Sequence, residues 1–103
     1  MVFISRQAKL DLDNIVIGLL EWDKISLTIP EVMQYVDDIV DICYQLHTLH
    51  YHHKATYNEH VTYGAYSYLY KRTRNTIWYI IYDIDAMDNI FVNKIISNYM
   101  TRS

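Results

Sequence analysis

Residues 76–97 read Thr-Ile-Trp-Tyr-Ile-Ile-Tyr-Asp-Ile-Asp-Ala-Met-Asp-Asn-Ile-Phe-Val-Asn-Lys-Ile-Ile-Ser. Two runs rich in β-branched and aromatic residues, 76–83 and 90–96, flank a short polar connection. Such residues suit a pleated surface, and the Asp and Asn residues between the runs are typical of a turn. The pattern predicts a β-hairpin. Because residues 77–82 supply apolar bulk to both faces, we expect the first run to be a central strand.

The chain before this hairpin begins with a short apolar run, residues 2–4, which predicts a first strand. Ser5 stands where the N-cap of a helix would be. Residues 7–22 then place apolar side chains three or four positions apart, which predicts an amphipathic helix. Gly18 lies inside this helix and weakens it by about 1 kcal/mol relative to Ala. We expect the missing side chain to let another backbone approach closely.

A second helix is predicted from Thr28 onwards. Thr28 and Glu31 have the spacing of a capping box, and Pro30 falls in the first turn, where a missing amide costs nothing. Apolar residues step by three and four as far as His50, so we expect a helix of about 22 residues. Its exposed side carries Asp37, Asp38 and Asp41. Residues 23–27 join the two helices, which predicts an antiparallel helical hairpin.

The remaining segments complete the expected order of elements. Residues 51–64 are polar and broken by Gly64, so we expect a loop. Residues 65–73 carry tyrosines at every second position, which predicts a strand. The order is then β-α-α-β-β-β, a single α+β domain over residues 1–103. We expect the helical hairpin to pack on one face of a small, mainly antiparallel sheet.

Composition restricts the function classes. The chain has 103 residues and a net charge of −3, without the basic excess that is typical of tight nucleic-acid binders. Its one cysteine, Cys43, excludes an internal disulfide and favours a reducing compartment. No apolar run of 18 residues and no signal-peptide pattern occur, so we expect a cytoplasmic protein with no membrane contact.

Five histidines gather around the end of the second helix and the loop that follows it: His47, His50, His52, His53 and His60. Histidine-rich tracts bind metal ions when their imidazoles converge. However, no cysteine or clear carboxylate partner stands beside them, and histidines near a helix C-terminus are favourable without any metal. The pattern therefore favours surface histidines, and we predict no metal and no cofactor.

The tyrosines of the third predicted strand share one face: Tyr66, Tyr68 and Tyr70. Tyrosines in a row can stack on nucleic-acid bases. They can also form a sheet face that helices or a protein partner cover, and we favour this second interpretation.

The only basic cluster, Lys71, Arg72 and Arg74, adjoins the same strand, and Lys94 of the last strand could come near it. Such a group could hold a phosphate or a carboxylate. A solvated sheet edge is an equally good interpretation, since lysine on an edge strand prevents aggregation. Tyr99 follows the last strand and could act as a general acid or base beside these cations.

Taken in this order, the elements resemble those of the RelE/ParE superfamily of type II toxin–antitoxin toxins, also known as plasmid stabilisation proteins. The likeness rests on the opening strand followed by Ala-x-x-Asp-Leu-x-x-Ile at residues 8–15, on the two helices, and on Trp-Tyr-Ile-Ile-Tyr-Asp-Ile-Asp at 78–85. It ends with Ile-Phe-Val-Asn-Lys-Ile at 90–95 and the tail from 97 to 101. The resemblance implies a growth-inhibiting toxin neutralised by a cognate antitoxin. Because the tyrosine-rich strand could pair across a two-fold axis, a homodimer and a heterotetramer with the antitoxin both stay open.

The resemblance leaves the activity open between two branches. Ribonuclease members, which cleave mRNA on the ribosome, place an arginine at the start of the strand that here begins with Thr76 and Ile77. They often carry a tail histidine or tyrosine as well, and Tyr99 retains only the tyrosine. We therefore favour a ParE-like toxin that binds a protein such as DNA gyrase. The alternatives are a ribosome-dependent endoribonuclease using Tyr99, Arg72, Arg74 and Lys94, and an inactive interaction module.

Overall fold

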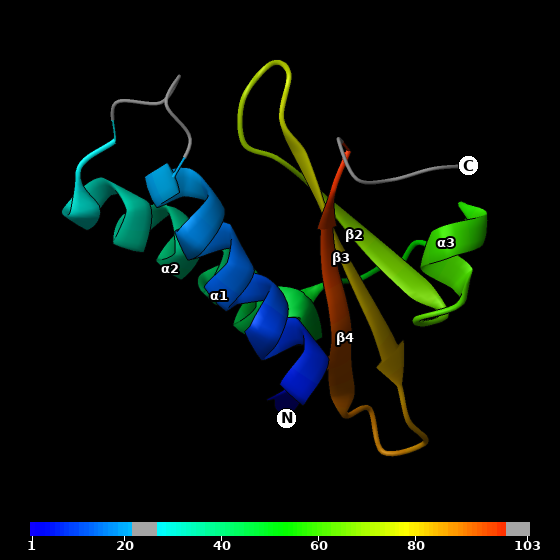
Figure 1. Ribbon diagram of the computed structural model, residues 1–103. Coiled ribbons are helices and arrows are strands. Elements are labelled where there is room, and N and C mark those ends of the chain that lie inside the picture. The colour runs from blue at the N-terminus through cyan, green and yellow to red at the C-terminus, as the bar shows by residue number, and fades with distance from the viewer. Residues whose placement is uncertain (22–26, 99–103) are drawn as a thin grey trace.

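A computed structural model describes residues 1–21 and 27–98 as an α+β fold in which helices cover a four-stranded mixed sheet (Figure 1). In chain order, the elements are β1 (Val2–Ile4), α1 (Arg6–Glu21), α2 (Ile29–Gln45), the 3-10 helix η1 (Leu46–Thr48), α3 (Asn58–Val61), β2 (Tyr66–Lys71), β3 (Ile77–Ile84) and β4 (Ile90–Ser97). The predicted α+β class and the mainly antiparallel character of the sheet are confirmed.

The sheet has the order β1-β4-β3-β2. β1 runs parallel to β4, whereas β3 is antiparallel to both β4 and β2. The predicted central strand is therefore central, since β3 has a neighbour on each side. Its residues from Trp78 to Tyr82 are all buried, which requires cover on both faces of the sheet.

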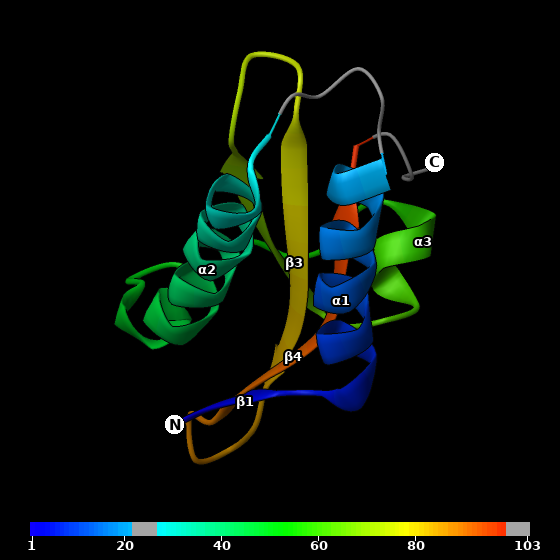
Figure 2. The same ribbon diagram turned by 60° about the vertical axis from the view of Figure 1, so that its left-hand side comes forward.

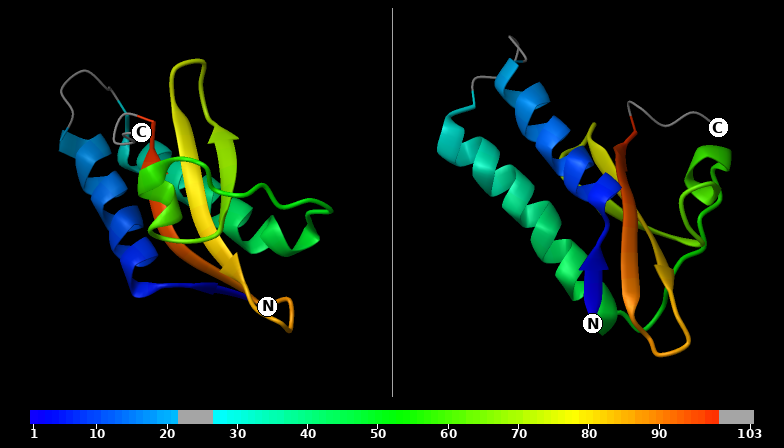
Figure 3. Two further views of the ribbon diagram at one scale, coloured as in Figure 1. Left: turned by 90° about the vertical axis from the view of Figure 1, so that its right-hand side faces the viewer. Right: turned by 60° about the horizontal axis from the view of Figure 1, so that its bottom comes forward.

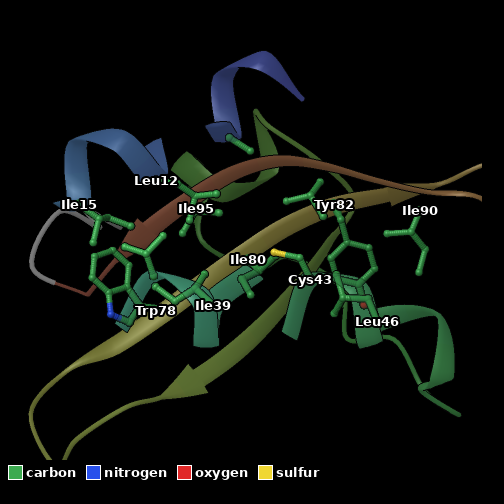
Figure 4. Close-up of a cluster of buried hydrophobic side chains, with 13 residues drawn as sticks. Leu12, Ile15, Ile39, Cys43, Leu46, Trp78, Ile80, Tyr82, Ile90 and Ile95 are labelled. Carbon is green, nitrogen blue, oxygen red and sulfur yellow. The ribbon is translucent and has the colours of Figure 1, made fainter. Parts of the chain in front are cut away.

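Helices α1 and α2 lie side by side on one face of the sheet (Figure 2). Between them and the sheet is the main core, which includes Leu12, Ile39, Ile80 and Tyr82 (Figure 4). The predicted capping box starts α2, with the Glu31 amide donating to the Thr28 hydroxyl and the Thr28 amide donating to Glu31. The helix ends earlier than predicted, at Gln45, and continues only as the short 3-10 helix η1.

The other face of the sheet carries the short helix α3 (Figure 3). Residues 51–64, predicted as a loop, therefore contain one turn of helix. Tyr57 and His60 place their rings 5.7 and 4.6 Å from that of Tyr79, which belongs to a smaller apolar cluster on this face. Gly64 lets this segment lie on the sheet, because a Cβ there would stand 2.9 Å from the carbonyl oxygen of Tyr82.

β4 contains a bulge that decides which of its side chains face the helices. Ile81 pairs with Lys94 while Tyr82 pairs with Val92, so Asn93 is an additional residue on β4. The bulge lets Val92 and Ile95 both enter the main core although they are three residues apart. β1 pairs with residues 90–92 alone, and beyond them α1 lies against the edge of β4.

Candidate functional site

A groove of about 750 Å³ lies where α1 meets the end of β4 and the start of β3. Most of its wall is apolar, formed by Ile15, Leu19, Leu27, Trp78 and Ile96. Figure 4 shows Ile15 and Trp78 at one end of the main core. Two of the predicted cationic residues, Arg72 and Lys94, also line this groove. Its size and largely apolar wall are typical of a ligand or peptide site.

Lys94 reaches the groove in an ion pair with α1. Its Nζ donates to Oδ1 of Asp11 at 2.9 Å, and the other oxygen of Asp11 accepts from the backbone amide of Ile95 at 3.0 Å. The Nζ also lies 5.3 Å from the centre of the Tyr63 ring. Asp11 is 6 % exposed, so the charge of Lys94 is neutralised by a carboxylate that the fold buries.

Arg72 is held by α2 in a similar way. One of its terminal nitrogens donates to Asp38 at 2.5 Å and to the Tyr70 hydroxyl at 3.1 Å, and its guanidinium carbon lies 4.0 Å from the centre of the Tyr35 ring. Burial of the guanidinium opposes its charge, but the bonds to Asp38 and Tyr70 outweigh this and raise the pKa of Arg72. The bond from Arg72, followed by one from Gln34, lowers the pKa of Asp38.

The sequence analysis predicted that Asp38 lies on the exposed side of the second helix, and this prediction is wrong. Asp37 and Asp41 are exposed as predicted, whereas Asp38 is part-buried against β2 through its pair with Arg72.

The other two predicted catalytic residues are not brought into this groove by the described part of the chain. Arg74 is exposed in the turn between β2 and β3 and does not line the groove, although its neighbour Thr73 does. Tyr99 lies outside the described residues. The predicted set thus separates into two ion-paired groove residues, Arg72 and Lys94, and the exposed Arg74.

Gly18 lines the groove, and the reason predicted for it is wrong. Among residues 1–21 and 27–98, a Cβ at this position would meet nothing within 4 Å, so no backbone of this part of the chain outside α1 approaches it closely. The missing side chain instead leaves open space in the wall that α1 forms. A glycine in a helix interior costs about 1 kcal/mol, and no close contact with the described residues outside α1 offsets that cost at Gly18.

The histidines do not converge, but the prediction that they lie on the surface is wrong for His60, whose side chain is fully buried. Among residues 1–21 and 27–98, no group of three histidine, cysteine, aspartate or glutamate side chains is arranged to hold a metal ion. His52 forms a 2.6 Å hydrogen bond with the Tyr82 hydroxyl, and His60 is buried beneath Tyr57. Burial raises the pKa of Tyr82 to about 12, so its hydroxyl stays protonated beside the Nδ1 of His52.

The tyrosine row of β2 faces the helices. Tyr66, Tyr68 and Tyr70 are part-buried against the main core, which confirms the interpretation as a covered sheet face rather than a base-stacking surface.

Two groove residues were missed by the sequence analysis as site residues, Asp11 and Tyr35. Asp11 carried a signal, because it stands between Ala8 and Leu12 on the apolar side of the predicted helix, where a carboxylate requires a partner. The ring of Tyr35 lies beneath the guanidinium of Arg72, and its hydroxyl accepts a 2.8 Å hydrogen bond from the indole of Trp78. Both partners are far from Tyr35 in the sequence, so no local pattern predicts these contacts.

No family model, curated protein or solved structure matches this chain. None of the helices in the described ranges has the length and apolar character that a membrane span requires.

Proposed function

We propose that this chain is the toxin component of a type II toxin–antitoxin system of the RelE/ParE kind, cytoplasmic and neutralised by a cognate antitoxin. It acts by binding a protein target, and DNA gyrase is the first target to test. The resemblance of residues 8–15 and 78–95 to that superfamily motivates the proposal, together with a non-basic start of β3 at Ile77.

The pairing of both groove cations with aspartates supports protein contact over RNA cleavage. A nuclease needs positive charge directed at the phosphate in the transition state. Here Asp11 neutralises Lys94 and Asp38 neutralises Arg72, while the wall between them is apolar. An apolar wall of this kind suits the side chains of a partner protein, since the buried centre of an interface is depleted of charge.

Induction of the chain in a bacterial host, with and without the short reading frame beside its gene, tests the toxin assignment. We expect growth arrest that the neighbouring product relieves. Purified protein at micromolar concentration should inhibit supercoiling by gyrase, and unchanged supercoiling would remove gyrase as the target. The mass of the isolated complex, measured by light scattering, distinguishes a homodimer from a heterotetramer with the antitoxin.

Filling the groove tests whether this surface makes the contact. Gly18→Leu adds a side chain where open space lies in the groove wall, and Leu is a better helix former than Gly. We expect this variant to fold and to lose growth arrest. Gly18→Ala is the matched control, because its single methyl leaves most of the groove open and should preserve the arrest. Full arrest by Gly18→Leu would place the contact elsewhere.

The alternative, a ribosome-dependent endoribonuclease, keeps one supporting observation. Arg74 is exposed beside Thr73 and Thr76, which line the groove, so a bound RNA could reach it. A Tyr99→Phe, Arg72→Ala double variant and an Arg74→Ala variant separate the possibilities. Loss of mRNA cleavage in translating extracts would favour the nuclease. Absence of any growth arrest in the parent, with the partner still bound, would favour an inactive interaction module.

A further inference from the structure

Two phenylalanines form an exposed stacked pair on the sheet face that α1 and α2 leave uncovered. The rings of Phe3 and Phe91 lie 5.2 Å apart with an angle of 14° between their planes. Phe3 is 44 % exposed and Phe91 is 37 % exposed, whereas Ile90 and Val92 on either side of Phe91 are buried in the main core. The two rings therefore point away from the helical layer.

The carboxylate of Asp83 continues the same row across the sheet. In the strand register Phe3 pairs with Phe91, and Phe91 pairs with Asp83, so the three side chains are neighbours on one face. The turn that follows β3 adds Asp85 and Asp88 at the end of this row.

The segment that contains Phe91 and the β3–β4 turn carries negative side chains. Residues 83–91 contain three aspartates and neither lysine nor arginine, and β1 carries no charged side chain. Amides of Asn89 donate to Asp85 and, with the amide of Met87 and the positive N-terminus, lower its pKa, so Asp85 stays ionised at neutral pH. The N-terminal amine lies close enough to Asp85 to add one positive charge beside it.

Helix α3 does not cover the pair. Its ring contacts are made with Tyr79, and Figure 3 shows it across the middle of the sheet, away from the β3–β4 turn and the N-terminus. The Phe3–Phe91 pair and the three aspartates define an aromatic–acidic patch that is separate from the groove.

We propose that the aromatic–acidic patch binds an arginine-containing basic segment of a protein partner. A guanidinium over a phenyl face is attracted by the ring electrons. The neighbouring carboxylates add negative charge, although the oxygens of Asp83 already accept from the Ala65 amide and the Asn93 side chain, so their attraction is electrostatic. The same aspartates repel phosphate, which disfavours single-stranded nucleic acid on these rings. The patch lies outside the groove, so this inference is independent of the proposed toxin activity.

Fluorescence anisotropy with a fluorescein-labelled octapeptide of alternating glycine and arginine measures the binding. Replacing the arginines with glutamates gives a control peptide, which should not bind. Phe3→Leu with Phe91→Leu keeps apolar bulk but removes both aromatic faces, and we expect its dissociation constant to rise about fivefold. Asp88→Asn should raise it by about twofold and tolerates the positive φ of 62° at this residue.

The acidic side of α2 provides the matched control. Asp37→Asn with Asp41→Asn removes two exposed charges without touching the patch, and peptide affinity should change less than it does in the phenylalanine variant. Weakening by the α2 variant alone would show unspecific attraction to acidic helices and overturn the proposal. Binding of a labelled oligothymidine at the rings, with no binding of the arginine peptide, would overturn it as well.

Amide chemical shifts of the unmodified protein give a second readout that needs no variant. On titration with the arginine peptide, we expect the largest shifts at Phe3 and in residues 83–91. Shifts confined to α2 or to the groove would contradict the proposal.

Discussion

Asp11 and Lys94 join the first helix to the last strand, with Nζ of Lys94 2.9 Å from Oδ1 of Asp11. The second oxygen of Asp11 accepts the backbone amide of Ile95, which lies beyond the stretch of β4 that pairs with β1. One carboxylate thus neutralises a groove cation and satisfies a buried strand amide. This dual contact makes Asp11 a structural residue that also decides how much positive charge the groove presents.

Replacing Asp11 should destabilise the protein more than replacing Lys94. Asp11→Ala leaves the Ile95 amide without its acceptor and Lys94 without its counter-ion, so we expect a loss of about 3 kcal/mol in the free energy of unfolding. Lys94→Met leaves the buried carboxylate bonded to the Ile95 amide and to Gln7, so it should cost less, about 2 kcal/mol. Urea unfolding of the two variants measures the difference.

Asp13→Ala serves as the control for this experiment, because Asp13 is exposed on the same helix and should change stability by less than about 0.5 kcal/mol. Equal losses for Asp11→Ala and Lys94→Met would show that the ion pair, and not the strand amide, carries the effect.

The two glycines should respond to alanine in opposite directions. At Gly18 an added methyl meets nothing within 4 Å and improves helix propensity, so Gly18→Ala should stabilise the protein by about 1 kcal/mol. At Gly64 the methyl would stand 2.9 Å from the Tyr82 carbonyl oxygen and 3.1 Å from a methyl of Ile81, so Gly64→Ala should cost about 2 kcal/mol. Thermal unfolding of both variants tests this, and a stabilising Gly64→Ala would contradict it.

Local patterns predicted the elements whose determinants lie close together in the sequence. The capping box at Thr28 and Glu31 uses residues three apart, and the apolar run of β3 fixes its central place by composition alone. Helix α3 was missed because its four residues are too few to show helical periodicity.

The site depended on pairings between residues far apart in the chain. Asp11 meets Ile95 across 84 positions, and Arg72 meets Asp38 across 34. The sequence showed Arg72 and Lys94 as cations but could not show that a helix carboxylate faces each of them. Gly18 illustrates the same limit, since a glycine that leaves space and one that permits close packing look alike in a sequence.

Acid should weaken the tie between Arg72 and Asp38. Because Arg72 and Gln34 donate to Asp38, its pKa in the folded protein lies below the ordinary value of 3.8. The unfolded state then binds a proton more readily, so the contribution to stability is present above about pH 4 and is lost as the pH falls through the folded pKa. Asp38→Asn should flatten the dependence of the urea midpoint on pH below about pH 4.

Asp85 has a lowered pKa for a different reason, its bonds from Asn89, and so the Asp38→Asn variant should keep part of the acid dependence. An unaltered curve for Asp38→Asn would mean that the pair with Arg72 contributes nothing in solution.

A separate loss of stability should occur near neutral pH because of His60. Burial lowers the pKa of this histidine below its ordinary value of 6.5, although Glu59 partly opposes the shift. As the pH falls below about 6.5, the unfolded chain takes up a proton that the folded protein resists, so stability decreases until the pH reaches the folded pKa.

His60→Phe keeps a ring against Tyr57 and Tyr79 and removes the titration. We expect its urea midpoint to vary less between about pH 7 and pH 5 than that of the parent, whereas His47→Gln, at an exposed position, should follow the parent. Parallel curves for His60→Phe and the parent would contradict the assignment, because the buried imidazole would then not be the group that titrates.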